Sequence, residues 1–527
     1  MHIRDHVITV PLDWNAPNDG RTLEIFAREI VDPTKRNDDL PMLAFLQGGP
    51  GGKSPRPTAP EGFLKSSLQR FRVILMDQRG TGRSSRIQGR TMQQFADPRD
   101  AAQFLLCFRA DSIVRDLEAL REREFNVRQW STFGQSFGGF ITLTYLSLAP
   151  QSLTACYVTG GLASITPSAE EVYRRTYPRV AEKNRQFYAR FPHNAQHVGR
   201  IADMLEAADV RLPDGDRLTT RRLQLIGLDF GMKPGFDRVH WLLDEAWQPG
   251  EDSLSDVFLA NVMAKTSFDD NPLFMVLQES IYGSGFGATN WAAERERPRH
   301  PEFATDRRPL FFTGEMMFPW MLDDIRSLRP FKAGAEALAS IESYAPLYDL
   351  DRLAANEVPV SAVVYHDDMY VDVGLSLDTA AHVGNTHAWV TNEFEHDGIQ
   401  AVEVAEKLFK YVDERGGRDH LLADEPHVVR AERHQRGEAD LVGPHRDGVG
   451  LLGRFEARDR PLEEQLVADR IRHAELEVAV GAAASPFPGI HRGARIVIGH
   501  PLEELLVAQP EQGVEDRGLA REVGVEG

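Results

Sequence analysis

The chain has 527 residues, of which 42% are hydrophobic and 26% are charged, a composition typical of a folded globular protein with more than one domain. Its formal net charge of −19 and its pI near 5.4 exclude nucleic acid and anionic membranes as main partners, because both attract basic surfaces. The start of the chain lacks the apolar core of a secretory signal, and no apolar run could span a bilayer. The two cysteines lie outside any metal-ligand spacing. We therefore expect the protein to be located in a reducing cytoplasm.

The first 160 residues alternate strand-like and helix-like segments, which predicts a mostly parallel sheet covered by helices. The first two strands alternate like an antiparallel pair, and the next two are short apolar runs that end in glycine-rich turns, as buried strands do. The expected strands cover 8–11, 23–30, 42–46, 73–76 and 128–133. One helix is expected to begin after Asp111, which serves as its N-cap, and a second helix is expected over 141–148.

A serine lies in a G-x-S-x-G motif between the last of these strands and the helix over 141–148, in the sequence Gly134-Gln-Ser-Phe-Gly138. This context is what the nucleophile elbow of an α/β-hydrolase requires. The glycines let the backbone pass close to neighbouring elements, and Ser136 is expected in a strained conformation at the top of the sheet. A glycine-rich surface turn is the alternative interpretation of the motif taken alone.

The pattern changes to long amphipathic helices between residues 161 and 345, for example over 170–191 and 256–265. Strand character returns at 358–365 and 386–392, and a last helix is expected over 400–411.

This order predicts an α/β-hydrolase fold with a mostly parallel central sheet and an inserted helical cap domain. Residues 1–160 and 346–416 are expected to form the core, and residues 161–345 the cap.

The segment 417–527 has a different composition. It contains no Lys, Trp, Tyr, Cys, Met, Asn or Thr, and Phe455 and Phe487 are its only Phe, Tyr or Trp residues. So few aromatic side chains provide little from which to build a core, and the segment is expected to be an atypical, disordered tail. Our hypothesis is that a shifted reading frame through GC-rich DNA produced it, and the alternative is a flexible interaction tail.

A serine hydroxyl needs a general base, an acid that orients the base, and donors for the oxyanion. An α/β-hydrolase places the acid just after a late strand and the histidine in a loop beyond the next one. Asp368 and His396 occupy those places, so His396 is expected to take the proton of Ser136 while Asp368 fixes the imidazole tautomer. Asp367 and Asp372 compete with Asp368 for the orienting role, and a lone histidine in a loop is commonly a solvated surface residue.

Two backbone amides are expected to form the oxyanion hole. Phe137, directly after the serine, supplies one, and Gly49 in the turn 47–52 supplies the other. The glycine density of this turn also suggests phosphate binding. However, Gln47 stands where the P-loop pattern requires glycine, so nucleotide binding is not expected.

Five motifs carry a resemblance to a known family: Gln47-Gly-Gly-Pro-Gly-Gly52, Asp77-Gln-Arg-Gly-Thr-Gly-Arg-Ser84, Gly134-Gln-Ser-Phe-Gly-Gly139, Asp367-Asp-Met369 and Glu395-His-Asp-Gly398. Together, over residues 1 to 415, they resemble the proline iminopeptidase (prolyl aminopeptidase) family of α/β-hydrolases, in particular its longer bacterial members. The resemblance implies a serine peptidase that needs no metal or other cofactor and whose partners are peptides with N-terminal proline. Many members have histidine in place of Gln47, a change that the backbone amides tolerate.

The family carries acidic cap residues that receive the substrate's protonated N-terminus, since a buried ammonium needs a carboxylate partner. Glu279 and Glu315 both lie among apolar or aromatic residues and are the substrate-binding candidates, with an ordinary solvated glutamate as the alternative for each. Asp77 and Arg79 are expected to pin the loop beside the elbow rather than to act in catalysis.

The expected reaction is acylation of Ser136 by the N-terminal prolyl residue, followed by hydrolysis of the prolyl-enzyme. An esterase, amidase or lactonase remains an alternative because the fold does not fix the substrate. Paired acids near the pocket would favour an aminopeptidase, and an entirely apolar pocket an esterase. A non-catalytic binding protein would require a broken site, whereas every catalytic position is filled. The sequence does not indicate the oligomeric state.

Overall fold

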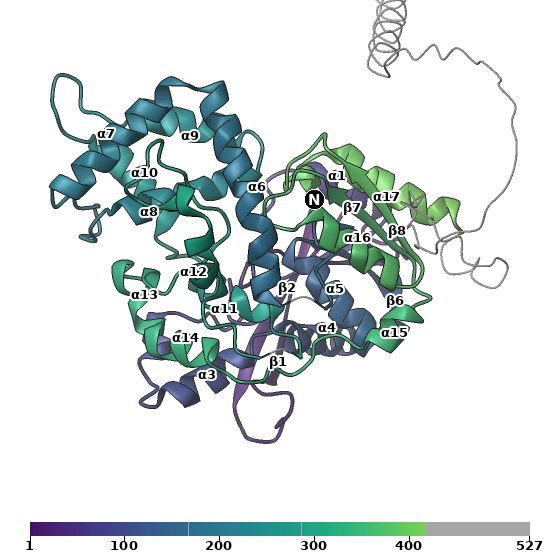
Figure 1. The fold of residues 1–527 in the computed structure, drawn as a ribbon. Coiled ribbons are helices and arrows are strands. Elements are labelled where there is room, and N and C mark those ends of the chain that lie inside the picture. Colours follow the sequence, from purple (N-terminus) through teal and green to yellow (C-terminus); the bar gives the residue numbers. More distant parts are fainter. Residues whose placement is uncertain (167, 286, 417–527) are drawn as a thin grey trace, which may run out of the picture. The chain divides into compact units, whose positions relative to one another are not determined.

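The computed structural model describes residues 1–166, 168–285 and 287–416, and the tail expected over 417–527 lies outside these residues. Within the described ranges the chain is built around one sheet of eight strands in the order β1-β2-β4-β3-β5-β6-β7-β8 (Figure 1). The strands are β1 (His2–Pro11), β2 (Thr22–Val31), β3 (Met42–Leu46), β4 (Arg72–Met76), β5 (Trp130–Gln135), β6 (Leu153–Thr159), β7 (Val360–Tyr365) and β8 (Thr386–Thr391).

The direction of the strands agrees with the fold class expected from the sequence. β2 runs antiparallel to its two neighbours, β1 and β4, and every other pair of neighbours is parallel. β1 starts well before the expected residue 8, because the ladder continues outward from the pair Ile8 and Ile25 as far as His2 and Val31. Only the second half of β1 is apolar, so hydrophobic alternation did not reveal its first half.

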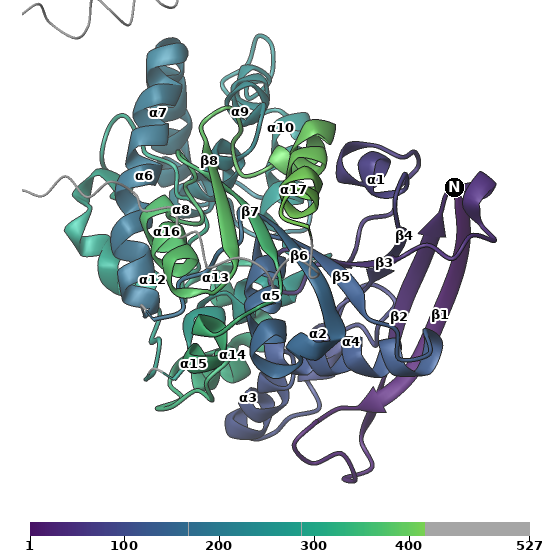
Figure 2. The same cartoon turned by 90° about the vertical axis from the view of Figure 1, so that its right-hand side faces the viewer.

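Helices cover both faces of the sheet, as they must where strands such as β3 and β7 are buried along their whole length. α1 (Gly62–Ser67) and α17 (Val402–Glu414) lie on one face, and α4 (Ala110–Glu124), α5 (Phe137–Leu148) and α16 (Val373–His382) on the other (Figure 2). On the first face the ring of Phe409 from α17 packs edge-on against Tyr157 of β6, with the ring centroids 4.7 Å apart.

Short elements complete the core. They are η1 (Pro33–Lys35), α2 (Gly89–Met92), α3 (Pro98–Leu106), η2 (Pro150–Ser152), α15 (Leu350–Ala354) and η8 (Gly398–Gln400). Several expected boundaries differ by a few residues: β5 and β7 each begin two residues later than expected, and two helices also differ. The N-cap of α4 is Arg109, so Asp111 lies inside the first turn, and the last helix covers Val402–Glu414 rather than 400–411 because 398–400 form a separate 3-10 turn.

Residues 161–345, between β6 and α15, which we call the cap, consist in their described part of helices and loops with two isolated bridges. Its elements are α6 (Ala169–Arg190), α7 (His193–Ala207), α8 (Thr220–Gln224), η3 (Leu225–Gly231), α9 (Gly235–Asp244), α10 (Asp256–Thr266), α11 (Pro272–Leu277), η4 (Glu279–Tyr282), α12 (Ala292–Glu296), η5 (Arg297–Arg299), η6 (Pro301–Phe303), α13 (Met321–Asp324), η7 (Arg329–Phe331) and α14 (Lys332–Ala339). The limits at 160 and 345 stay a prediction.

The cap has its own aromatic centre and also packs on the core. Phe187 of α6 packs against Phe230 and Phe312, at centroid distances of 4.8 Å and 6.1 Å, and these two rings are 5.6 Å from each other. At the other end of the cap, α14 packs against α3 (Figure 1). Gly334 allows this approach, because a Cβ there would lie 3.0 Å from the Cβ of Ala101. Cap and core therefore belong to one compact unit.

Candidate active site

The turn between β5 and α5 has the geometry of a nucleophile elbow. Ser136 has φ 53° and ψ −121°, a conformation that costs free energy for a residue with a side chain. A Cβ on Gly134 would lie 2.5 Å from the carbonyl oxygen of Gly138, and a Cβ on Gly138 would overlap the carbonyl oxygen of Leu46. Both glycines are therefore required by close packing, which an ordinary surface turn would not demand.

Asp368 and His396 lie together in loops that follow neighbouring strands. Asp368 comes just after β7 and His396 beyond β8, and both are buried. The Nδ1 atom of His396 is 2.6 Å from Oδ2 of Asp368, while Oδ1 of Asp368 accepts the main-chain N–H groups of Tyr370 at 2.8 Å and Val371 at 3.1 Å. Every oxygen of this carboxylate is thus in use, and its orientation is fixed.

The two competing aspartates have other partners. Asp367 is exposed and binds His366 on the surface. Asp372 caps α16 by accepting the N–H of Leu375 and pairs with Arg179 of the cap. The structure therefore brings Asp368, and neither of the other two, to His396.

Surrounding charges favour the protonated form of His396. Burial lowers the pKa of this histidine, but the charge of Asp368 and its hydrogen bond to the ring, together with the charge of Glu315, outweigh burial, so the pKa lies above its usual value. An imidazole in this environment is well suited to accept a proton, since the imidazolium that forms is paired at once.

The end of β6 connects the serine and the histidine. The main-chain N–H of Ser136 donates to the carbonyl of Thr159, the last residue of β6. A Cβ on the next residue, Gly160, would lie 3.0 Å from Nδ1 of His396. In addition, the side chain of Gln135, which precedes the serine, donates to the main-chain carbonyl of His396 at 3.0 Å. Ser136 and His396 therefore border the same edge of the sheet.

The glycine-rich turn 47–52 lies directly against the elbow. A Cβ on Gly48 would lie 3.2 Å from Cβ of Ser136, and Gly49 has a φ of +130° that favours glycine. Phe137 is the first residue of α5, so its N–H has no carbonyl partner within the helix. Phe137 therefore directly follows the serine, and Gly49 lies in the turn whose neighbouring residue, Gly48, packs on the serine. The orientation of their amides toward a substrate stays a prediction.

Asp77 and Arg79 hold these loops in place, as expected. Asp77, fully buried, accepts the main-chain N–H of Ser54 at 3.0 Å and of Arg83 at 2.8 Å and also pairs with Arg56. The buried Arg79 donates to both oxygens of Asp116, at 2.7 Å each.

The comparisons with known proteins agree with this geometry. The α/β hydrolase fold family matches residues 41–331. A proline iminopeptidase of Aeromonas sobria is 48% identical over 401 residues, which are 76% of this chain and 93% of that protein. The chain belongs to the proline iminopeptidase family. A proline iminopeptidase of Aspergillus aculeatus is 34% identical over 425 residues, 77% of this chain and 92% of that protein.

Of the two acidic candidates, Glu315 is the one whose pKa is affected by the charges of His396 and Asp368. It is partly buried in the cap, and burial raises its pKa to about 7, with the charge of His396 opposing and that of Asp368 adding to the rise. The preceding residue, Gly314, packs against Met369, which follows Asp368: a Cβ on Gly314 would lie 2.8 Å from Cε of Met369. The segment that carries Glu315 therefore lies beside the loop that carries Asp368.

Glu279 already has partners inside the cap. Its two oxygens accept the main-chain N–H groups of Ala292 at 2.9 Å and Ala293 at 3.0 Å, so the carboxylate closes the start of α12. Burial raises its pKa to about 7, against the lowering effect of these hydrogen bonds. Each oxygen keeps a further lone pair for another donor.

Sequence reasoning overlooked two polar residues beside these acids. Gln278 is fully buried, and its Oε1 has no hydrogen-bond partner among the described residues, while its amide group interacts with Glu315. The hydroxyl of Tyr173 is also buried without a partner in this part of the chain. A glutamine between apolar residues and a tyrosine in an amphipathic helix carry no signal that would have singled them out.

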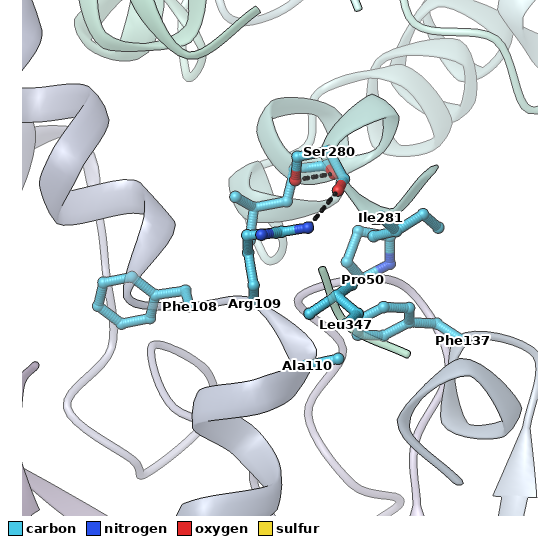
Figure 3. A pocket seen from close by; sticks show the side chains of 9 residues that line it. Pro50, Phe108, Arg109, Ala110, Phe137, Ser280, Ile281 and Leu347 are labelled. Carbon is cyan, nitrogen blue, oxygen red and sulfur yellow. Dashed lines mark hydrogen bonds between the residues drawn. The ribbon is translucent and has the colours of Figure 1, made fainter. Parts of the chain in front are cut away.

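A small cavity lies beside the elbow rather than at the catalytic pair. Its lining includes Pro50, next to Gly49, and Phe137, next to the serine (Figure 3). Arg109 extends from the start of α4 along this cavity to η4, where it donates to the carbonyl of Gly283 at 2.8 Å. This arginine joins the core to the cap segment that carries Glu279.

Within the described ranges, no three His, Cys, Asp or Glu side chains are grouped so that they could hold a metal ion. A search of the same residues for a helix apolar and long enough to cross a membrane finds none.

Proposed function

We propose that the protein is a serine aminopeptidase that releases N-terminal proline from peptides. The observation that carries the proposal is the pairing of His396 with Asp368 beside the Ser136 elbow, together with the position of Glu315 in the cap, where the preceding Gly314 packs on Met369. An acid at this place favours an aminopeptidase over an esterase, because an ester substrate offers no ammonium to pair with it. The names of the related proteins support the same activity.

The first half of the reaction is acylation. Oγ of Ser136 attacks the carbonyl carbon of the N-terminal proline while Nε2 of His396 takes the hydroxyl proton. The amides of Phe137 and Gly49 stabilise the negative oxygen of the tetrahedral intermediate. The C–N bond then breaks, His396 returns the proton to the leaving amine, and the shortened peptide departs.

The second half is hydrolysis of the prolyl ester. Water gives a proton to His396 and attacks the same carbon, and the C–O bond to Ser136 breaks as the proton returns to the serine oxygen. Free proline and the original enzyme result. Asp368 keeps the proton of the imidazole on Nδ1 throughout, so that Nε2 faces the reacting atoms.

The cap acids select the end of the chain. An N-terminal amine has a pKa of about 8 and carries a positive charge at neutral pH. We assign Glu315 as its direct partner, because the neighbouring Gly314 packs on Met369, next to Asp368, whereas both oxygens of Glu279 already bind α12. Glu279 is the second substrate-binding residue, through the lone pairs that α12 leaves free.

The test compares hydrolysis of proline, alanine and leucine naphthylamides with that of a p-nitrophenyl ester. We expect the proline amide to be cleaved with the highest kcat/KM. Ser136→Ala should remove this activity, whereas Ser131→Ala on the same strand should keep it. Ester cleavage without any aminoacyl-amide cleavage would overturn the peptidase assignment, and full activity of Ser136→Ala would overturn the mechanism.

A further inference from the structure

Helix α6 of the cap presents a row of basic side chains to the two loops that carry the catalytic acid and base. Arg175, Arg179 and Lys183 are one helical turn apart, so they share one face. Nε of Arg179 is 2.6 Å from Oδ2 of Asp372, and the same side chain donates to the carbonyl of His366 at 3.0 Å. These two partners stand on either side of Asp368 in the sequence.

Lys183 makes the corresponding contact with the histidine loop. Its Nζ lies 2.7 Å and 2.6 Å from the two oxygens of Glu395, the residue immediately before His396. The side chain of Lys183 is only 5% exposed and that of Glu395 21%. In contrast, Arg185 and Glu182 of the same helix form a pair that is 57% and 55% exposed. A pair withdrawn from water holds its partners far more firmly than an exposed one.

Further restraints on the histidine loop also come from the cap. The main-chain N–H of His396 donates to the carbonyl of Gly231 at 2.9 Å. The next residue, Asp397, accepts the N–H of Lys233 at 3.0 Å. The ring of Tyr370 lies edge-on to that of His396, with the ring centroids 4.8 Å apart. The hydroxyl of Tyr370 donates a hydrogen bond to the carbonyl of Leu228 in the cap.

The core supports this loop through the hydrogen bond between Asp368 and His396 and through Phe394, whose ring packs against Tyr365 of β7. β8, which leads into it, is the edge strand of the sheet, and its residues are only partly buried or exposed. The side-chain bond from Gln135 is a core contact to the His396 main chain. The cap contacts add to this support and restrain a base that must keep its angle to the nucleophile.

We propose that Lys183 is a positioning residue for catalysis, which holds His396 in register with Ser136 through its ion pair with Glu395. The cap then helps to position Asp368 and His396, in addition to enclosing the substrate site. This inference rests on the catalytic roles in the proposed function but not on the preference for proline.

The first test is Lys183→Met, with Arg185→Met as the matched control on the exposed side of α6. We expect kcat of Lys183→Met to fall about tenfold with KM within about twofold, because a base displaced by a fraction of an ångström still permits binding. Lys183→Arg, which keeps the charge, should regain most of the loss, and Arg185→Met should match the native enzyme. A folded Lys183→Met with unchanged kcat, or a loss entirely in KM, would overturn the proposal.

Two further measurements separate positioning from stability and from substrate choice. If Lys183→Met does not fold, Glu395→Gln tests the same pair, and its kcat should fall while its melting temperature stays close to that of the native enzyme. The same fractional loss is expected for a p-nitrophenyl ester, because both reactions use the same base. A parallel loss on the ester would support the proposal even if the proline preference proved wrong, whereas an unchanged ester kcat in folded Glu395→Gln would overturn it.

Discussion

Asp368 binds the imidazole of His396 with one carboxylate oxygen, at 2.6 Å from Nδ1, and receives two main-chain N–H groups on the other. The carboxylate cannot rotate without losing these bonds. The proton of the imidazole is therefore held on Nδ1, and Nε2 is left as the acceptor.

Replacing this carboxylate should disable the enzyme without unfolding it. In Asp368→Asn the amide can donate to Nδ1 and favour the wrong tautomer, so we expect kcat/KM to fall by about 10³ to 10⁴. Steady-state kinetics on proline naphthylamide measures the loss. Asp367→Asn is the control, since Asp367 is exposed and binds only His366 among the described residues. An equal loss in this control would contradict the assignment of Asp368.

The pH dependence of kcat/KM should reflect two groups on its acid side. His396 must be neutral to act as base, and its pKa is raised, so activity falls as the pH drops through a value above 6.5. Glu315, with a pKa of about 7, must be ionised to receive the ammonium. We therefore expect an acid limb steeper than that of a single ionisation, and an alkaline limb where the substrate amine loses its proton at about 8.

Glu315→Gln distinguishes the two groups. The variant should lose activity on proline naphthylamide, and its remaining acid limb should have the slope of one group. A p-nitrophenyl ester, which carries no ammonium, should lose much less activity. An acid limb identical to that of the native enzyme would argue against Glu315 as a substrate partner.

The parts of the candidate site that lie in local sequence motifs could be predicted, whereas contacts between segments far apart in the sequence could not. The elbow could be predicted because Gly134, Ser136 and Gly138 are adjacent in sequence and steric demands act over that short distance. The buried strands were recognisable because full burial requires apolar runs, unbroken in β3 and interrupted only by Ser361 in β7.

The sequence pointed to Asp368 by its place after a late strand but left Asp367 and Asp372 as competitors. Asp367 and Asp368 stand in the same turn, and only the path of the chain after β7 turns one toward His396 and the other to the surface. The contact of Lys183 with Glu395 was hidden for a different reason, because the two residues are 212 positions apart. Neither amphipathic periodicity nor a motif connects them.

The ionised form of Glu315 should destabilise the folded protein. Its pKa in the native state, about 7, is above the ordinary value of 4.5, so the native state binds more protons than the unfolded state between these values. The cost is absent below about pH 4.5 and complete above about pH 7. Glu315→Gln should therefore raise the free energy of unfolding by about 1 to 3 kcal/mol at pH 8 and change it little at pH 5. Urea denaturation at both pH values measures this, and equal effects at the two would contradict it.

Removing the segment from Gly417 onward should leave catalysis intact. Every residue assigned to the site precedes Gly398, and the match to the Aeromonas sobria relative, which spans 93% of that protein, covers 76% of this chain. We expect the truncated enzyme to keep the kcat/KM of the full chain on proline naphthylamide. A truncated protein that folds but has lost activity would instead support a functional role for the tail.

The buried pair of Arg79 and Asp116 should contribute to stability and not to the chemical step. Both side chains are fully buried, and burial raises the pKa of Asp116 even with Arg79 beside it. Arg79→Met leaves this carboxylate without its cation, so we expect a loss of about 3 to 5 kcal/mol in the free energy of unfolding, measured by urea denaturation. Adding Asp116→Leu should recover part of the loss, because no charge then remains buried.

Arg128→Met, which breaks an exposed pair with Asp39, should cost less than about 1 kcal/mol. Activity per folded molecule should stay near the native value in all three variants, and a specific fall in kcat of folded Arg79→Met would mean that Arg79 acts in catalysis after all.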